Sequence, residues 1–203
     1  MNIIASNLTM NSTLSKRKKT DYIVLHHRAG DGDIASIHSQ HLANGWAGVG
    51  YHLYVRKNGQ VFSGRPLDTV GAHCIGYNEI SVGICFEGNF ENETMSALQL
   101  AAGREAVSYL KALYPSARVV KHGDLIATAC PGKNFPFEKL KNGTEIKEAE
   151  NVNKKKLESA NDITWELKQM IEILDSDGFV AALEKAKEED SPLYWGYYKI
   201  VNK

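Results

Sequence analysis

The alternation of short apolar runs with longer amphipathic stretches is what most constrains the fold of this chain. Residues 22–27 form a β-branched and aliphatic run, which is typical of a buried strand. Residues 34–42 and 95–113 instead carry apolar side chains at helical spacing. Further strand-like runs lie at 51–55, 60–62, 80–86 and 118–121. Because these elements alternate without clean βαβ repeats, the sequence predicts an α/β fold with a central mixed β-sheet flanked by helices.

Two local signals refine this prediction. Lys57-Asn58-Gly59 separates the runs 51–55 and 60–62, and an Asn-Gly pair between two strands predicts a hairpin turn. Gly103 lies inside the helix expected over 95–113, where glycine costs about 1 kcal/mol relative to alanine. We therefore expect Gly103 to permit close packing of that helix on the sheet.

Composition and charge exclude several classes of function. The chain has 203 residues, 43% of them hydrophobic and 24% charged, as in a soluble globular protein. Lys+Arg and Asp+Glu balance at 24 each, so no net basic field favours nucleic acid as a partner. No apolar run is long enough for a transmembrane helix or, in the first twenty residues, for a signal peptide. We expect synthesis in the cytoplasm without a signal peptide and no stable membrane insertion, and we interpret Lys16–Lys19 as a solvated turn.

The distribution of histidine and of charge predicts how the chain is divided. All seven histidines lie between His26 and His122, whereas residues 138–161 are dominated by Lys, Glu, Asn and Gly. We predict one chemistry-bearing domain over residues 1–143, a charged linker over 144–160 and a small C-terminal helical module over 161–203. The aromatic residues near the C-terminus either pack inside that module or form a binding surface on it; they are Tyr194, Trp195, Tyr197 and Tyr198.

Histidine and cysteine are placed where a metal site can form. His122 follows the strand expected over 118–121, seven residues separate it from Cys130, and either His26 or His27 ends the strand over 22–27. Neighbouring strand ends can bring these groups together, and a thiolate with imidazoles suits zinc. Three protein ligands and a water are typical of a catalytic zinc site. A lone cysteine is also commonly a small buried hydrophobe, so spacing alone leaves the metal undecided.

The wider pattern resembles a known family. The matching motifs, which run in consistent order over about residues 20–140, are Ile23-Val-Leu-His-His27, Gly45-Trp-Ala-Gly-Val-Gly-Tyr-His52, Gly64-Arg-Pro66, Gly71-Ala-His73, Asn78-x-x-Ser81-Val-Gly-Ile84, His122-Gly-Asp124 and Thr128-Ala-Cys-Pro-Gly132. Together they resemble the type 2 N-acetylmuramoyl-L-alanine amidases, a family shared by phage endolysins, bacterial autolysins and animal peptidoglycan recognition proteins.

The resemblance implies a zinc site in the domain over 1–143. It makes His26, His122 and Cys130 the ligands of Zn²⁺. His27 and His52 alternate to the opposite sides of their strands. His27 is expected to pack or to support the ligands, and His52 to lie in the core.

It also implies the residues that act on the substrate. Tyr51 and Thr128 are the expected catalytic residues, which stabilise the negative charge that develops on the amide oxygen. His73, Trp46 and Asn78 are the expected substrate-binding residues of a groove.

Two positions near His122 need separate expectations. Gly123 stands where the family often has arginine. Asp124 is expected to cap a turn or to orient His122.

The function that this resemblance implies is zinc-dependent hydrolysis of the amide bond between N-acetylmuramic acid and L-alanine in peptidoglycan. The expected role is that of an endolysin or an autolysin. The absence of a signal peptide fits an endolysin that acts on the cell wall after release; it also fits a cytoplasmic recycling enzyme, which Cys130 and the tail disfavour. The alternatives are a non-catalytic peptidoglycan-binding module and a fold, with a structural zinc or without metal, whose function lies in the tail. Non-catalytic family members typically lack a ligand, most often the cysteine, so the presence of Cys130 favours the enzyme. The C-terminal module is a candidate for cell-wall targeting or self-association.

Overall fold

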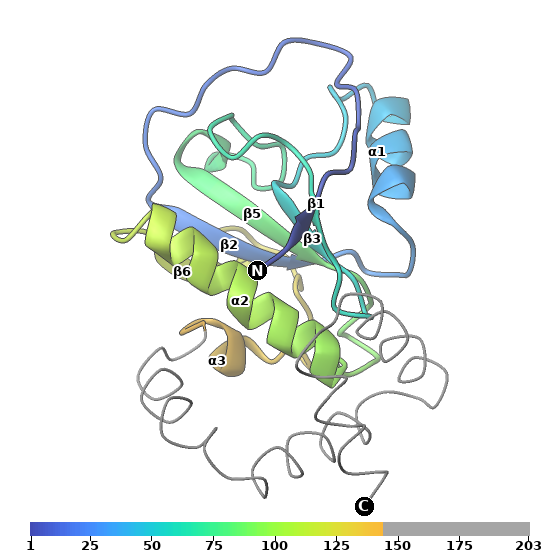
Figure 1. Ribbon diagram of the computed structural model, residues 1–203, viewed down its shortest axis with the longest axis vertical. Helices are drawn as coiled ribbons and strands as arrows, with labels where there is room; N and C mark the ends of the chain where they lie inside the picture. The colour runs from blue at the N-terminus through green and yellow to red at the C-terminus, as the bar shows by residue number, and fades with distance from the viewer. Residues whose placement is uncertain (144–203) are drawn as a thin grey trace, which may run out of the picture. The chain divides into compact units, whose positions relative to one another are not determined.

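The computed structural model describes residues 1–143, and six strands of this part of the chain form one sheet (Figure 1). The linker and the helical module expected over 144–203 lie outside the described residues. In spatial order, the strands are β1 (Ile3–Ile4), β4 (Val61–Ser63), β3 (Leu53–Val55), β5 (Ser81–Phe86), β2 (Tyr22–His27) and β6 (Arg118–Lys121).

The sheet is mixed, as the sequence predicts. Strand β2 lies between β5 and β6 and runs parallel to both, and β3 is parallel to β5. Strands β3 and β4 form the one antiparallel pair among the described strands, joined by the predicted hairpin turn. Gly59 has a φ of 85° in that turn, a conformation that favours glycine. The carboxyl ends of β2, β5 and β6 consequently meet at the same edge of the sheet.

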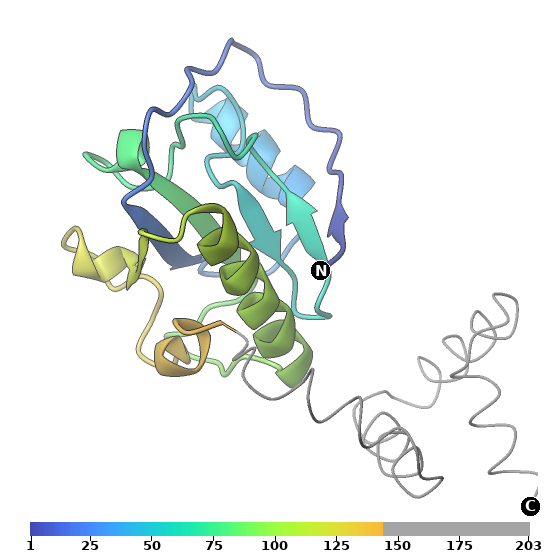
Figure 2. The same cartoon turned by 60° about the vertical axis from the view of Figure 1, so that its left-hand side comes forward.

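Helices cover both faces of this sheet. Helix α1 (Ile34–Ala43) packs on the face that carries Tyr54 and Cys85, and helix α2 (Ala97–Leu113) packs on the face that carries Leu53 and Ile84. Figure 2 shows α2 in front of the strands and α1 behind them. Side chains of adjacent residues in a strand point to opposite faces, which explains why neighbouring residues belong to different cores. The predicted α/β architecture with flanking helices is confirmed.

Both helices begin at a residue that caps their free N–H groups. The side chain of Asp33 accepts a hydrogen bond from the backbone of Ser36 at the start of α1, and Ser96 does the same for Gln99 at the start of α2. Within α2, Gly103 lies directly against the ring of Phe86. A Cβ atom at Gly103 would stand 2.5 Å from that ring, so the expected close packing on the sheet is confirmed.

Some of the described structure was not predicted. The two-residue strand β1 and the short helix α3 (Phe137–Leu140) are additional elements, and Leu140 is fully buried in the core beneath α2. Two 3₁₀ turns are also present: η1 (Asn78–Ile80) directly precedes β5, and η2 (His122–Asp124) directly follows β6. Among residues 1–143, no helix combines the length and apolarity needed to cross a membrane.

The interpretation of Lys16–Lys19 as a solvated turn is wrong for Arg17. Its guanidinium donates hydrogen bonds to the backbone carbonyls of Leu67 and Thr69, each at 2.6 Å, and to the hydroxyl of Tyr114. Arg17 therefore fastens the N-terminal segment to the body of the fold, and the flanking lysines face solvent. A run of four basic residues contains no signal that distinguishes the one that is held.

Candidate active site

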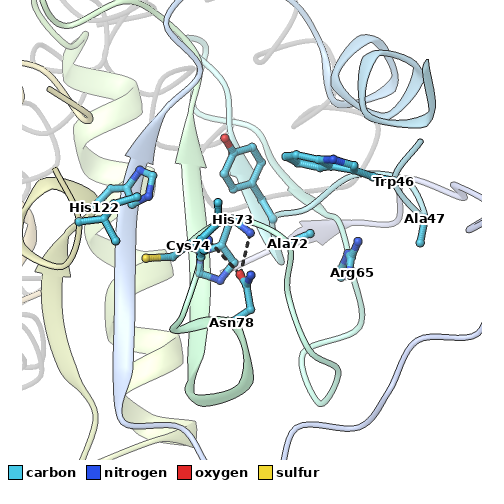
Figure 3. A pocket seen from close by; sticks show the side chains of 11 residues that line it. Trp46, Ala47, Arg65, Ala72, His73, Cys74, Asn78 and His122 are labelled. Atoms are coloured by element: carbon cyan, nitrogen blue, oxygen red, sulfur yellow. Dashed lines mark hydrogen bonds between the residues drawn. The ribbon is translucent and has the colours of Figure 1, made fainter. Parts of the chain in front are cut away.

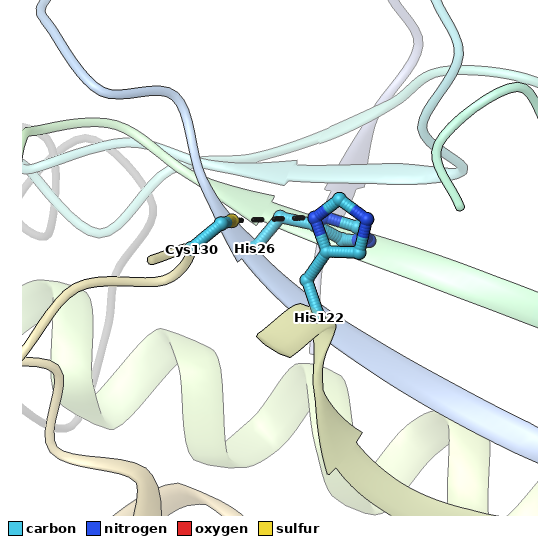
Figure 4. Close-up of side chains that lie close together, drawn as sticks. All are labelled: His26, His122 and Cys130. Carbon is cyan, nitrogen blue, oxygen red and sulfur yellow. Dashed lines mark hydrogen bonds between the residues drawn. The ribbon is translucent and has the colours of Figure 1, made fainter. Parts of the chain in front are cut away.

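Three metal-binding side chains converge at the carboxyl edge of the sheet. His26 lies near the end of β2, His122 follows β6 directly, and Cys130 lies in the next loop. One donor atom from each lies within 4.8 Å of the other two (Figure 4). Nδ1 of His26 is 3.9 Å from Sγ of Cys130, and the two imidazole centroids are 4.3 Å apart. Because β2 and β6 are in parallel register, their ends deliver the two histidines to adjacent positions.

The loop that returns Cys130 to the site is closed by short backbone contacts. The N–H of Gly123 donates to the carbonyl of Cys130 at 2.9 Å, and the Thr128 hydroxyl accepts the N–H of Cys130 at 3.2 Å. A Cβ atom at Gly123 would stand 2.8 Å from the carbonyl oxygen of Thr128, so a side chain here would push the loop away. Asp124 caps η2 by accepting the N–H of Lys121, which fulfils one of its two expected roles.

The electrostatics of the three groups suit a soft cation. Burial, followed by the neighbouring His73 and His122, holds the pKa of His26 well below its usual value, and burial also lowers the pKa of His122. Both imidazoles are therefore neutral at pH 7, with a free electron pair each. Burial raises the pKa of the Cys130 thiol to about 11, so a cation that binds there displaces the thiol proton.

One buried nitrogen of this cluster has no hydrogen-bond partner among the described residues. Within the described part of the chain, Nε2 of His122 is buried and makes no hydrogen bond. A buried polar atom without a partner lowers the stability of the fold, and a bound metal ion is one partner that would satisfy this nitrogen. Two imidazole nitrogens and a thiolate form a donor set that zinc prefers. The residues present therefore fit a zinc ion.

A groove opens beside the three donors. Its volume is about 590 Å³, and His122 belongs both to its wall and to the donor cluster (Figure 3). The side chains that line it are Trp46, Ala47, Tyr51, Arg65, Ala72, His73, Cys74, Ile75, Asn78, His122 and Ile126. Four of the expected substrate and catalytic residues are thus placed together, since the wall includes Tyr51, His73, Trp46 and Asn78.

Tyr51 lies between the donor cluster and the groove. Its ring centroid is 5.2 Å from that of His26, and its hydroxyl lies near the Cys85 thiol. Burial, followed by Cys85 and Cys130, raises the pKa of Tyr51 well above its usual value. The phenol therefore keeps its proton at neutral pH and can act only as a neutral hydrogen-bond group.

Thr128 lies differently from the other expected residues. It is exposed and does not belong to the lining of the groove, although it is two residues from Cys130. Its hydroxyl oxygen accepts a backbone N–H, which leaves its own proton available to another acceptor.

The two walls of the groove are held together through their main chains. The N–H of Ala72 donates to the carbonyl of Gly50 at 3.0 Å, and a Cβ atom at Gly50 would stand only 2.0 Å from the Ala72 oxygen. The imidazole of His41 accepts the N–H of Gly50 and lies against the ring of Trp46, at a centroid distance of 4.5 Å. Trp46 is 42% exposed, which leaves an apolar face open to the groove.

The opposite wall is fixed by Asn78. Its Oδ1 accepts the backbone N–H groups of His73 at 2.8 Å and Cys74 at 2.9 Å, as the dashed lines in Figure 3 mark. The imidazole of His73 is buried, and its Nδ1 lies 3.0 Å from Nε2 of His26. His73 therefore contacts both the groove and a metal-binding side chain.

Sequence reasoning missed several lining residues. Arg65 is buried, and its guanidinium donates to the carbonyls of Val49 and Val70, so it shapes the wall from within. The Gly64-Arg-Pro66 motif is the sequence feature that could have identified Arg65 as a lining residue. Ile75 is 83% exposed at the rim, and Ile126 lies near His122 in sequence; no pattern distinguishes either from an ordinary loop residue.

The two histidines expected outside the site are indeed elsewhere. His27 points away from the donor cluster, and its Nδ1 accepts the N–H of Phe90. His52 is fully buried between the N–H of Gly83 and the carbonyl of Thr69.

Known proteins are similar to this chain in sequence and in fold. The sequence profile described as N-acetylmuramoyl-L-alanine amidase matches residues 16–133. The endolysin of Klebsiella phage KP32 is 35% identical over 58% of this chain and 83% of its own length. The endolysin of Escherichia phage T7 is 30% identical over 57% of this chain and 83% of its own length.

Solved structures agree with these relatives. The N-acetylmuramoyl-L-alanine amidase LysC from Clostridium intestinale is 37% identical with a TM-score of 0.67, over 70% of this chain and 95% of that one. A peptidoglycan recognition protein, LE, solved in complex with tracheal cytotoxin, is 26% identical with a TM-score of 0.63, over 72% of this chain and 98% of that one. Since the profile match covers more than half of the residues, this chain belongs to the N-acetylmuramoyl-L-alanine amidase family.

Proposed function

We propose that this protein is a zinc-dependent N-acetylmuramoyl-L-alanine amidase that cleaves the amide bond between N-acetylmuramic acid and L-alanine in peptidoglycan. The observation that carries the proposal is the convergence of donor atoms from His26, His122 and Cys130 beside an open groove. Membership of the amidase family and similarity to phage endolysins support the reaction.

The three side chains would hold the metal. Three protein ligands leave a coordination position for water or substrate, which is the arrangement of catalytic rather than structural zinc sites. Zinc in such a site supplies a Lewis acid for the substrate carbonyl and lowers the pKa of water. The presence of Cys130 favours this reading over a non-catalytic peptidoglycan-binding module.

Tyr51 and Thr128 are the proposed catalytic residues of the chain itself. The protonated phenol of Tyr51, beside the ring of His26, can donate a hydrogen bond to the oxygen on which negative charge develops. Thr128 would add a second neutral donor from the loop that carries Cys130. Neither residue supplies a positive charge, so stabilisation by the protein depends on directed hydrogen bonds.

The groove residues are proposed to position the muramyl peptide. The open face of Trp46 offers an apolar surface to a sugar ring or a peptide methyl group. His73 and Asn78 form the facing wall, where peptide groups can be bound. Structures of related recognition proteins with tracheal cytotoxin, a monomeric peptidoglycan, support peptidoglycan as the ligand.

We further propose an endolysin-like life cycle, in which the protein is made in the cytoplasm and reaches the cell wall after release. Similarity to phage endolysins supports this. The module over 161–203 is proposed to target the wall or to mediate self-association.

Digestion of purified peptidoglycan with and without a chelator tests the reaction. We expect zinc-dependent release of stem peptides that begin with L-alanine, identified by mass spectrometry, and recovery when zinc is restored. Binding without cleavage in the presence of zinc would instead identify a recognition module.

A further inference from the structure

We propose that His73 is a positioning residue that holds His26 in the tautomer whose Nδ1 electron pair faces Cys130. This inference rests on the proposed zinc site. It assigns His73 a role besides contact with the substrate.

The contact between the two histidines is direct and buried. Nε2 of His26 lies 3.0 Å from Nδ1 of His73, and the two rings are almost perpendicular, at 83°. The other nitrogen of His26, Nδ1, lies 3.9 Å from Sγ of Cys130. His26 thus uses one nitrogen for the donor cluster and the other for His73, which is how metal-binding histidines are commonly held.

The direction of the hydrogen bond follows from Ser81. Its hydroxyl donates its only proton to the carbonyl of Tyr77 at 2.7 Å. Toward Nε2 of His73, at 3.5 Å, the same oxygen can therefore only accept. A neutral imidazole has one N–H and one free electron pair, so His73 carries its proton on Nε2 and accepts at Nδ1. His26 must then carry its proton on Nε2, which leaves Nδ1 free to bind a metal.

The fold leaves a space for the imidazole of His73. Cβ atoms at Gly71 and Gly83 would stand 2.4 Å and 2.7 Å from the ring, so both positions need to lack a side chain. Gly83 and Ser81 lie on the same face of β5, the strand that pairs with β2. Strand β5 therefore supplies both the space and the terminal acceptor. Asn78 fixes the backbone N–H of His73 from the other side.

Zinc affinity of the full-length protein tests this role. We would measure it by competition with a chromophoric chelator for wild type, His73→Leu and His73→Asn. Leu removes the acceptor, and we expect zinc to bind about 10- to 100-fold more weakly. Asn presents an oxygen near the place of Nδ1, so it should restore much of the affinity. Equal zinc affinity in wild type and a folded His73→Leu protein would overturn the proposal and leave the zinc site standing.

A second readout does not require zinc. Nitrogen-15 NMR of the metal-free protein should find His26 as a single tautomer protonated on Nε2 in wild type and a mixture of tautomers in His73→Leu. Protonation of His26 on Nδ1 in wild type would contradict the proposal. Failure of wild type to bind zinc, with the predicted tautomer present, would contradict the zinc site instead.

If His73→Leu does not fold, Gly83→Ala gives an independent variant. The added methyl displaces the imidazole without removing a polar group, and circular dichroism verifies the fold. We expect the same weakening of zinc binding and the same loss of a single His26 tautomer. A folded Gly83→Ala protein with wild-type values for both would also overturn the proposal.

Discussion

Cys130 is the side chain whose chemistry most directly tests the metal site. Serine is similar in shape but offers a hydroxyl, which binds zinc far more weakly than a thiolate. We expect Cys130→Ser to lose zinc and amidase activity together and to keep its fold, because Cys130 is only partly buried. Metal analysis with an activity assay checks this, and Cys74→Ala is the control that should retain zinc. Normal activity of Cys130→Ser without bound zinc would contradict the prediction.

Tyr51 tests the proposed stabilisation of negative charge. Tyr51→Phe keeps the ring beside His26 and removes only the donor. We expect kcat to fall about 100-fold, as for the loss of one oxyanion donor, with unchanged zinc affinity. Steady-state kinetics on a soluble muropeptide measure this. A kcat equal to that of wild type would exclude Tyr51 from the chemistry.

His52 predicts how stability depends on pH. Burial, with Arg17 and Arg65 nearby, lowers its pKa from 6.5 to about 3. Between these values only the unfolded state is protonated, so stability is present above pH 6.5 and is lost as the pH falls toward 3. His52 alone should remove about 2 kcal/mol of unfolding free energy between pH 7 and pH 5.

Urea unfolding at both pH values measures this loss. His52→Asn does not titrate, so its stability should fall about 2 kcal/mol less over the same interval. Equal losses in the two proteins would show that His52 does not carry the dependence.

At the scale of elements, the N-terminal segment depends on Arg17. Its guanidinium supplies two hydrogen bonds to backbone carbonyls of the 65–70 loop. We expect Arg17→Ala to lower the free energy of unfolding by about 2 kcal/mol, because bonds to a charged donor are lost. Lys18→Ala, at the exposed neighbouring position, is the matched control and should change it little. Equal effects in the two variants would contradict the anchoring role.

Helix α2 offers a test in which two effects oppose each other. Gly103→Ala should gain about 1 kcal/mol in helix propensity, but its methyl would press on the ring of Phe86. Overpacking of a core costs about 1–3 kcal/mol, so we expect a net loss of stability. Thermal unfolding shows whether the substitution lowers or raises stability. A stabilised variant would show that the ring of Phe86 can move aside at little cost.

Elements with strong periodicity could be predicted from sequence, and contacts between distant loops could not. Strand β2 has the predicted bounds because its apolar run is bordered by polar residues. Strand β1 has two residues, too few for any period, and depends on pairing with β4. The groove residues His73 and Asn78 could be predicted because they belong to sequence motifs. The contact of His73 with His26 could not, because it joins positions 47 residues apart. His73 lies in the loop before β5, its ring packs against Gly83 of that strand, and β5 pairs with β2, so the contact depends on tertiary structure.

At the scale of the whole molecule, residues 1–143 contain a continuous hydrophobic core. Leu140 closes it beneath α2, shortly before the proposed boundary at residue 143. We expect a protein truncated after residue 143 to remain soluble and to cleave small muropeptides, with reduced action on intact cell walls. Turbidity assays on cells and muropeptide kinetics separate the two activities. A truncated protein that cannot fold would show that the boundary is wrong.

The backbone contact between Gly50 and Ala72 has a consequence for how this groove can diversify. Because main-chain atoms set the distance between the walls, side chains at the rim can change without altering the width. Trp46 and Ile75 are exposed there and support little of the core. Substitutions at Trp46 and Ile75 are therefore expected to change which substrates the groove prefers without changing the distance between its walls.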